Sequence, residues 1–295
     1  MIPLTLVTGF LGSGKTTLLQ QLARRHAERR IVWVVNEFSA RDVDSTRLRG
    51  LSANVVSVTG GSIFCRCKAT EYLDLLRSLP TRFQPEAVVI EASGIADPTV
   101  ARKLLSECKL DHHYFMAEVI AVVDPGSFLK LLHTLPNIRT QVESATRVLI
   151  NKIDLYAPAQ IEAAEMAVRA IHASVPITRT QHCAMECDLF TVGVSGPLAG
   201  ELAPCVDPRY VQFAVPMPAD VDVEHLREVV APVADDVYRI KGHVRAAGTC
   251  LEVDYSLAGW RFTETCDNVQ PELVVIVRGD RSESMGQLLK GLRAR

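Results

Sequence analysis

The sequence predicts an α/β protein in which a doubly wound parallel sheet is followed by a smaller α+β domain. Short apolar runs alternate with stretches of helical periodicity through the first two thirds of the chain. Several runs are continuously apolar, as strands buried on both faces of a parallel sheet tend to be. Near residue 190 the alternation stops, and a segment rich in Gly, Pro and Ala follows. We therefore expect a first domain at 1–190, a linker at 191–208 and a second domain at 209–295.

The elements of the first domain follow from runs of two kinds. Leu73, Leu76 and Leu79 recur at helical spacing, whereas the strand candidates are short and rich in β-branched residues. We expect strands at 3–8, 31–35, 55–58, 87–90, 119–123, 147–150 and 176–178, and helices at 15–27, 69–79 and 157–172.

The second domain mixes strands and helices without the regular alternation of the first. This order is typical of an α+β unit rather than of a continued parallel sheet. We expect strands at 210–215, 237–241, 249–255 and 272–278, and helices at 223–230 and 284–292.

Composition excludes several broad classes. The chain has 295 residues, 48% hydrophobic and 22% charged, which is ordinary for a globular protein able to bury a large core. Its 32 basic and 34 acidic residues give a net charge of -2, which argues against a nucleic-acid partner or a polybasic membrane binder. Eight cysteines are too few for a disulfide scaffold.

The apolar segment 1–12 resembles a signal peptide only superficially. It lacks a basic beginning and a small-residue cleavage site, and it runs directly into Lys15-Thr16-Thr17. We interpret it as a buried first strand, and the longest apolar runs are far shorter than the roughly 20 residues that cross a bilayer. A cytoplasmic location without membrane contact follows, where cysteines are free thiols or metal ligands.

The segment 9–16, GFLGSGKT, fits the pattern G-x-x-x-x-G-K-[ST] between a strand and a helix. Glycines allow backbone N–H groups to turn inward around phosphate oxygens, and the helix directs its positive end at the same anion. Lys15 would reach the β- and γ-phosphates, and the Thr16 hydroxyl would bind Mg²⁺. The fold is therefore predicted to be that of a P-loop NTPase. The expected phosphate-binding residues are Gly9, Gly12, Ser13, Gly14, Lys15, Thr16 and Thr17.

A second motif, Asn151-Lys152-Ile153-Asp154, follows the strand expected at 147–150. N-K-x-D at a strand end is how P-loop GTPases recognise guanine. The Asp154 carboxylate can accept from both guanine N1–H and N2–H₂, a pair that adenine lacks. The aliphatic stem of Lys152 can lie over the base. GTP and GDP are therefore the expected nucleotides.

The buried strand expected at 87–90 ends in an acid, Glu91, followed by Ala92-Ser93-Gly94. A carboxylate there could hold Mg²⁺ directly or through water. Gly94 could bring its N–H close to the γ-phosphate, because it has no side chain. The predicted catalytic residues are Lys15, Thr16 and Glu91, of which Thr16 and Glu91 are the predicted Mg²⁺ ligands.

Taken together, these motifs resemble the CobW-like P-loop GTPases, relatives of HypB, UreG and MeaB. The second domain matches more weakly, through the segment 238–242, YRIKG. The resemblance implies slow GTP hydrolysis coupled to delivery of a metal or metallocofactor to a client metalloprotein or cofactor-synthesis enzyme. It is carried by TGFLGSGKTT at 8–17, NEF at 36–38 with Asp44, TGG at 59–61, IEASGIADP at 90–98, VVD at 122–124 and NKID at 151–154.

The metal motif departs from the family pattern. CobW-like proteins carry C-x-C-C after the glycines, whereas this chain has GGSIFCRC at 60–67. Cys65 keeps its place and Cys67 is extra, so two thiolates remain for Zn²⁺ or Co²⁺. Because two ligands do not close a tetrahedral site, Glu37 is the expected third. The His112/His113 pair or a second subunit of a homodimer could complete the set.

The remaining cysteines have the plainer interpretation of ordinary thiols. Cys183 and Cys187 are spaced for one face of a helix and could share a metal there, although the helix itself is a weak prediction. The histidines His182, His225 and His243 are scattered and form no tract for metal storage. The ordinary-thiol interpretation also covers Cys108, Cys205, Cys250 and Cys266.

Three functions remain open. In the first, a GTPase switch delivers metal, and the γ-phosphate orders the segments 37–44 and 60–67. In the second, a regulatory G-protein chaperone gates cofactor loading of a client, such as a corrinoid enzyme, and holds no transition metal itself. In the third, the P-loop serves a small-molecule kinase, which the N-K-x-D motif disfavours.

Overall fold

The computed structural model describes residues 1–37, 48, 50–52, 54–59, 69–94, 96–190, 210–256, 259–265, 270–279 and 282–293. The chain divides into two compact units, Met1–Cys205 and Val206–Arg295. The expected linker at 191–208 lies outside the described residues, so the limits proposed for it and for the two domains remain predictions.

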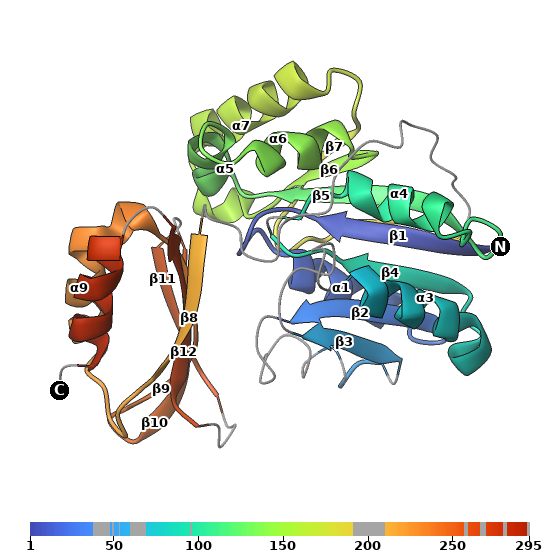
Figure 1. Ribbon diagram of the computed structural model, residues 1–295. Helices are drawn as coiled ribbons and strands as arrows, with labels where there is room; N and C mark the ends of the chain where they lie inside the picture. Colours follow the sequence, from blue (N-terminus) through green and yellow to red (C-terminus); the bar gives the residue numbers. More distant parts are fainter. Residues whose placement is uncertain are drawn as a thin grey trace. The chain divides into compact units, whose positions relative to one another are not determined.

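The first unit is built on a parallel sheet (Figure 1). Its described strands lie in the order β3-β2-β4-β1-β5-β6-β7, and every recorded pair is parallel. From β1 the chain continues to β2 and then to β3 at one edge, and β4 returns to lie between β2 and β1. The later strands β5, β6 and β7 lie on the other side of β1. β1 therefore lies at the switch point, where such sheets bind ligands. The doubly wound prediction is confirmed. The strands are β1 (Ile2–Thr8), β2 (Ile31–Glu37), β3 (Val55–Thr59), β4 (Ala87–Glu91), β5 (Tyr114–Val123), β6 (Arg147–Ile150) and β7 (Ile177–Arg179).

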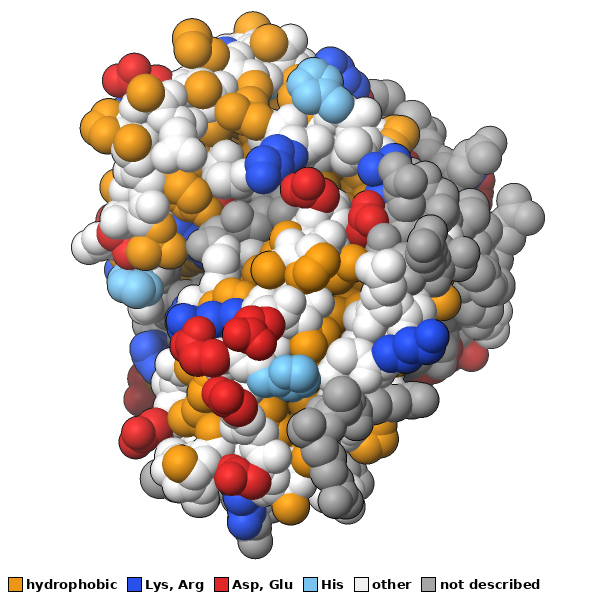
Figure 2. Space-filling view, turned by 90° about the vertical axis from the view of Figure 1, so that its left-hand side faces the viewer, with side chains coloured by type: hydrophobic (Ala, Val, Ile, Leu, Met, Phe, Trp, Pro, Cys, Tyr) orange, Lys and Arg blue, Asp and Glu red, His pale blue; other side chains and the backbone are white. Residues whose placement is uncertain are grey.

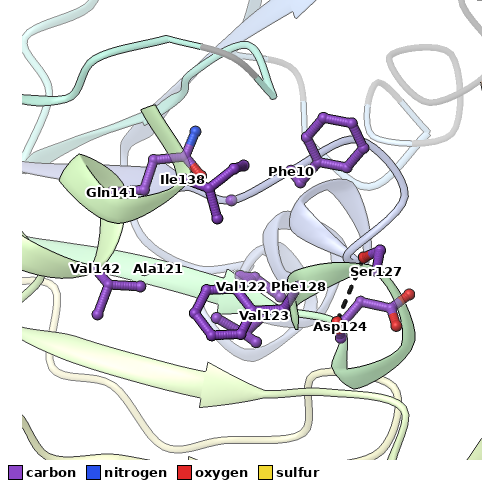
Figure 3. Close-up of a pocket in the computed structure, with 11 residues that line it drawn as sticks. Phe10, Ala121, Val122, Val123, Asp124, Ser127, Phe128, Ile138, Gln141 and Val142 are labelled. Carbon is purple, nitrogen blue, oxygen red and sulfur yellow. Dashed lines mark hydrogen bonds between the residues drawn. The ribbon is translucent and has the colours of Figure 1, made fainter. Parts of the chain in front are cut away.

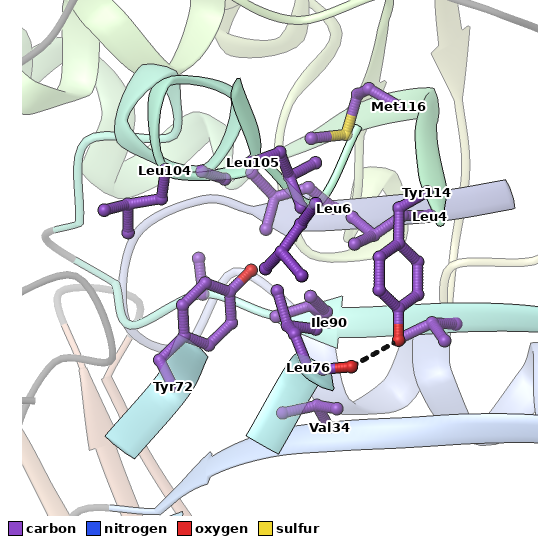
Figure 4. Packing of buried hydrophobic residues seen from close by; sticks show 14 of the residues in the cluster. Leu4, Leu6, Val34, Tyr72, Leu76, Ile90, Leu104, Leu105, Tyr114 and Met116 are labelled. Atoms are coloured by element: carbon purple, nitrogen blue, oxygen red, sulfur yellow. Dashed lines mark hydrogen bonds between the residues drawn. The ribbon is translucent and has the colours of Figure 1, made fainter. Parts of the chain in front are cut away.

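Helices cover both faces of this sheet. On one face, α3 and α4 pack on β1, β2 and β4, and Tyr114 donates its hydroxyl to the Leu76 carbonyl at 2.7 Å (Figure 4). On the other face, Leu18, Leu19 and Leu22 of α1 pack on Trp33 and Val89. Burial on both faces explains why the central strands are continuously apolar. The helices are α1 (Lys15–Arg25), α3 (Ala69–Phe83), α4 (Thr99–Glu107), α5 (Pro125–Leu132), α6 (Pro136–Glu143) and α7 (Pro158–Ile171), with a 3₁₀ turn η1 (Ile153–Leu155).

Several boundaries differ from the sequence prediction. The helices α4, α5 and α6 were not expected. Each has only eight or nine residues, and α5 and α6 open with a proline that is equally typical of a turn. The strand β5 begins at Tyr114 rather than at 119, since buried Glu118 is neutralised there by Arg147 at 2.7 Å. The helix α3 continues past Pro80 to Phe83, and α1 ends at Arg25 rather than at 27.

The second unit is an antiparallel sheet with helices against one face, which confirms the α+β prediction. Its described strands lie in the order β11-β10-β9-β12-β8. Leu226 and Val230 of α8 and Leu288 and Leu292 of α9 share one core with the sheet. The strand β9 is longer than expected and β11 was not expected. The elements are β8 (Tyr210–Pro216), α8 (Val223–Val230), η2 (Ala231–Asp236), β9 (Val237–Ala246), β10 (Thr249–Ser256), β11 (Gly259–Glu264), β12 (Glu272–Arg278) and α9 (Ser282–Arg293).

The surface carries charge of both signs. On the face shown in Figure 2, described Lys and Arg side chains are dispersed among Asp and Glu, and hydrophobic side chains lie between them. Among the described residues, no helix combines the length and the apolar character needed to cross a membrane.

Gly242 of β9 provides a test of the second unit. Its φ is +153°, and a Cβ there would overlap the Glu272 carbonyl of the neighbouring strand. Because backbone cannot move aside as a side chain can, we expect Gly242→Ala to lower the free energy of unfolding by about 1–3 kcal/mol. Gly286 of α9 is the control, since nothing lies within 4 Å of its Cβ position. Gly286→Ala should raise stability by about 0.5–1 kcal/mol. Urea denaturation measures both, and equal losses would contradict the prediction.

Candidate functional site

The loop between β1 and α1 is a tight glycine turn. Gly9, Gly12 and Gly14 have φ values of +133°, +79° and +118°, which side-chain-bearing residues rarely adopt. A Cβ on Gly9 would overlap the Val122 carbonyl, and one on Gly14 would overlap the Asn151 amide. The backbone can therefore follow this path only with glycine. It leads directly into α1, whose first residue is Lys15, so the positive end of the helix faces the loop.

Lys15 is buried inside this loop. Its Nζ donates to the Gly9 carbonyl at 2.9 Å and to the Phe10 carbonyl at 3.2 Å. Two hydroxyls at the same edge of the sheet, Ser13 Oγ and Ser93 Oγ, are buried without a hydrogen-bond partner in the described part of the chain. Buried polar atoms are normally satisfied. A cationic, donor-rich loop with unpaired hydroxyls can bind an anion such as phosphate.

The acid predicted from the sequence lies beside this loop. Glu91 ends β4, and the Thr16 hydroxyl donates to its two carboxylate oxygens at 3.2 and 3.3 Å. The carboxylate is buried, with 7% of the residue exposed. A hydroxyl and a carboxylate oxygen are ligands that Mg²⁺ accepts in proteins. Residues far apart in sequence are therefore brought together as a donor set that fits this ion.

The segment after Glu91 lies against the glycine loop. The Ala92 N–H donates to the Val7 carbonyl at 2.9 Å, and the Ala96 N–H closes a turn on the Ser93 carbonyl at 3.0 Å. A Cβ on Gly94 would come within 2.6 Å of the Leu11 nitrogen. Gly94 therefore permits a close contact between the two segments that a larger residue would prevent.

Asn151 links the second motif to the glycine loop. It is 2% exposed, and its Nδ2 donates to the Ser13 carbonyl at 2.9 Å. Its Oδ1 accepts from the Cys183 N–H at 2.9 Å. Asp154 lies in η1 and is exposed. The structure thus places the two motifs at one edge of the sheet, joined through a buried amide.

Sequence reasoning overlooked two features of this end of the site. Asp124 caps α5 through the Gly126 N–H at 3.0 Å and accepts from Lys152 Nζ at 2.7 Å. The VVD motif at 122–124 was a signal for it, although no role followed from the motif alone. The second feature is the loop after β7, where His182 and Cys183 have φ values of 52° and 55°. Consecutive left-handed non-glycine residues mark local strain that often accompanies function.

The thiols Cys183 and Cys187 do not share a helix face, which excludes the metal pair considered from their spacing. Cys183 Sγ donates to the Gly14 carbonyl at 3.3 Å, whereas Cys187 Sγ donates to Glu118 Oε2 at 2.9 Å. Burial raises the pKa of Cys183 to about 12. Burial and the Glu118 carboxylate also raise the pKa of Cys187. Both are therefore protonated near neutral pH and act as hydrogen-bond donors.

The expected transition-metal ligands lie mainly outside the described residues. Glu37 ends β2 with its backbone paired to Thr59, but its side chain, Cys65 and Cys67 are not among them. Asp44 of the resemblance also lies outside. In the described ranges, no cluster of three His, Cys, Asp or Glu side chains could hold a metal.

His112 and His113 cannot complete this set within one chain. They precede β5, where the Ile2 N–H donates to the His113 carbonyl. Glu37 lies at the opposite, carboxyl edge of the parallel sheet. At about 3.3 Å per strand residue, the two edges are about 20 Å apart. The suggestion that this pair supplies ligands to Glu37 in the same subunit is therefore wrong.

A strand, a glycine loop with buried lysine, a helix and a threonine–carboxylate pair together define a P-loop nucleotide-binding domain. The chain belongs to the CobW/HypB/UreG family, whose nucleotide-binding domain matches residues 3–179.

Proteins similar in sequence align with this chain over different fractions of their length. The zinc chaperone YjiA of Escherichia coli K12 is 29% identical over 260 residues, which cover 82% of this chain and 81% of YjiA. The zinc-regulated GTPase metalloprotein activator 1 of Saccharomyces cerevisiae is 25% identical over 209 residues, 61% of this chain and 48% of the yeast protein. The crystal structure of Zn(II)-bound E. coli YjiA GTPase aligns over 99% of both chains, with 22% identity and a TM-score of 0.50, which shows a shared fold.

The buried thiols give a prediction for this edge of the sheet. Iodoacetamide at pH 8, followed by peptide mass spectrometry, should modify Cys183 and Cys187 only after the protein is unfolded in urea, since the thiolate is the nucleophile. Cys108 and Cys250, which are partly exposed, are the internal controls and should react in the native protein. Native labelling of Cys183 at the rate of Cys108 would contradict the buried hydrogen bond to Gly14.

The same raised pKa values predict a loss of stability at alkaline pH. A free thiol ionises with a pKa near 8.5, so below that pH both folded and unfolded thiols are protonated and the term is constant. Above it the unfolded chain ionises first, which lowers the free energy of unfolding. Urea denaturation should show stability falling between pH 8.5 and pH 10, and Cys183→Ser should reduce that slope. An unchanged slope in the variant would contradict the assignment to this thiol.

Proposed function

We propose that this chain is a GTP-hydrolysing metallochaperone that delivers a transition metal to a client metalloprotein or cofactor-synthesis enzyme. The observation that carries the nucleotide part is the bond from Asn151 to the Ser13 carbonyl, because it ties an N-K-x-D motif to a glycine loop that can bind phosphate. The family membership of residues 3–179 supports the same activity.

The phosphates would lie in the glycine loop 9–14. Lys15 would turn its ammonium from the Gly9 and Phe10 carbonyls toward the β- and γ-phosphate oxygens. Thr17, in the first turn of α1, would also contact the phosphates. Thr16 and Glu91 would hold Mg²⁺, which neutralises phosphate charge when it is bound. Gly94 would offer its N–H to the γ-phosphate.

The base would lie at the other end of the site. Asp154 would accept from the two guanine N–H groups, and its exposure leaves it accessible to a ligand. Asp124 holds the Lys152 ammonium, and this bond would direct the aliphatic stem across the base. Asn151 donates one Nδ2 hydrogen to the Ser13 carbonyl, and its second hydrogen would serve an acceptor atom of the base.

Metal delivery rests on Glu37, Cys65 and Cys67. The paired ends of β2 and β3 support this set, since Glu37 and Thr59 are neighbours and the cysteines follow Thr59 in sequence. Zn²⁺ is the first candidate because the curated relatives are named as zinc proteins, and Co²⁺ is the second. Coupling to nucleotide would be reciprocal, so metal should change GTP affinity by the factor by which GTP changes metal affinity. A reducing cytoplasm would keep these thiols available, and a homodimer could supply further ligands.

A base-exchange variant tests the nucleotide part. In Asp154→Asn an amide donor replaces one acceptor, which suits xanthine, with its carbonyl in place of the guanine amino group. We expect GTP affinity to fall by about 100-fold and XTP affinity to rise, as buried pairs dominate such discrimination. Fluorescence titration with both nucleotides measures the exchange. Asp111→Asn, at the exposed turn before β5, is the matched control, and a variant that behaves like this control would refute the role of Asp154.

A metal titration tests the second part. Zn²⁺, Co²⁺ and Ni²⁺ should bind the GTP-loaded protein more tightly than its Cys65→Ala, Cys67→Ala double variant, by at least about tenfold, because two thiolate ligands are lost. Unchanged metal affinity would refute the site. If GTP affinity is also insensitive to metal, the chain is a regulatory chaperone that gates cofactor loading. Transfer of phosphate to an acceptor other than water would instead identify a kinase.

A further inference from the structure

The buried amide of Gln141 connects α6 to the turn that follows Glu91. Gln141 is 2% exposed, and its Nε2 donates to the Gly94 carbonyl at 3.1 Å and to the Ala96 carbonyl at 3.3 Å. An amide nitrogen carries two hydrogens, so both are used in holding one turn. No sequence motif includes this residue.

The turn makes contacts with two parts of the chain. Gly94 lies against the glycine loop, where its Cβ position is 2.6 Å from the Leu11 nitrogen. Gln141, which lines the same small cavity as Phe10 of that loop, holds the Gly94 and Ala96 carbonyls. Where the turn ends, Asp97 accepts from the N–H of Thr99, the first residue of α4, at 2.9 Å. A shift of Gly94 out of this position would therefore break the Gln141 bonds.

Gln141 supports the turn beside the site and is not one of the proposed Mg²⁺ ligands. Figure 3 shows it on α6 beside Ile138 and Val142, around a small cavity that Phe10 of the glycine loop also lines. Ile138 and Val142 are buried. Their packing fixes α6 and therefore the point from which the Gln141 side chain extends. None of its recorded hydrogen bonds reaches Lys15, Thr16 or Glu91.

We infer that Gln141 is a positioning residue for recognition of the γ-phosphate. By holding the Gly94 carbonyl, it keeps the Gly94 backbone against the glycine loop, where the N–H would meet a γ-phosphate. A nucleoside diphosphate has no such group, so its binding does not depend on this position. The inference rests on the proposed GTPase function and adds to it a residue that distinguishes GTP from GDP.

The test compares affinities for GDP and for a non-hydrolysable GTP analogue. Gln141→Met keeps the side-chain length and removes both donors. We expect its affinity for the analogue to fall about tenfold, as two ordinary hydrogen bonds are lost, with GDP affinity within about twofold of the original. The matched control is Glu143→Met on the same helix, whose exposed carboxylate pairs only with Arg139 among the described residues. It should change neither affinity. Equal losses for both nucleotides in Gln141→Met would overturn the inference.

A second variant keeps the test decisive if Gln141→Met does not fold. Gln141→Glu repels both carbonyls when it is ionised, but it regains one O–H donor when protonated, and burial raises the pKa of such a carboxyl. The analogue-to-GDP affinity ratio should therefore rise toward the original value between pH 8 and pH 5.5, relative to the unaltered protein at each pH. A ratio that does not change with pH would overturn the inference. Failure of the unaltered protein to bind any guanine nucleotide would instead refute the proposed function.

Discussion

Close approach between backbone segments determines the carboxyl edge of the parallel sheet. Three glycines make it possible: Gly9 lies against the Val122 carbonyl, Gly14 against Asn151, and Gly94 against the Leu11 nitrogen. Each contact leaves no room for a Cβ: Gly9 and Gly94 allow main chain to meet main chain, and Gly14 makes room for the Asn151 side chain. Donors and acceptors are held at short range there, which an anion site requires.

The buried polar side chains at this edge depend on that close packing. Asn151 reaches both the Ser13 carbonyl and the Cys183 N–H only because Gly14 leaves room for its amide. Thr16 meets Glu91 because α1 begins directly after the loop. Such networks stabilise a site when every member is satisfied. Among the described residues at this edge, the Ser13 and Ser93 hydroxyls have no partner within the protein, so a bound ligand could satisfy them.

The segment after β7 is secured in the same way. Cys183 bonds to the glycine loop, Cys187 bonds to Glu118, and the Glu118 carboxylate is neutralised by Arg147 at 2.7 Å. Farther along, the Phe190 ring lies 4.0 Å from the Arg29 guanidinium, a cation–π contact with the loop between α1 and β2. These thiols are structural donors with raised pKa values, which separates them from the proposed ligands Cys65 and Cys67.

The fold class and the motifs of the proposed nucleotide site could be predicted from local sequence. Gly9 to Thr16 and Asn151 to Asp154 are local motifs, and their chemistry depends on neighbours in the chain. Short helices such as α5 and α6 carry too little periodicity to be predicted. Three contacts could be found only in the folded chain: Gln141 holds Gly94, Asp124 holds Lys152, and Cys183 donates to the glycine loop. These pairs join segments whose separation in sequence bears no relation to their distance in space, so no local pattern encodes them. The same reason separates His112 and His113 from Glu37, because strand direction, which sequence spacing does not show, puts them at opposite edges of the sheet.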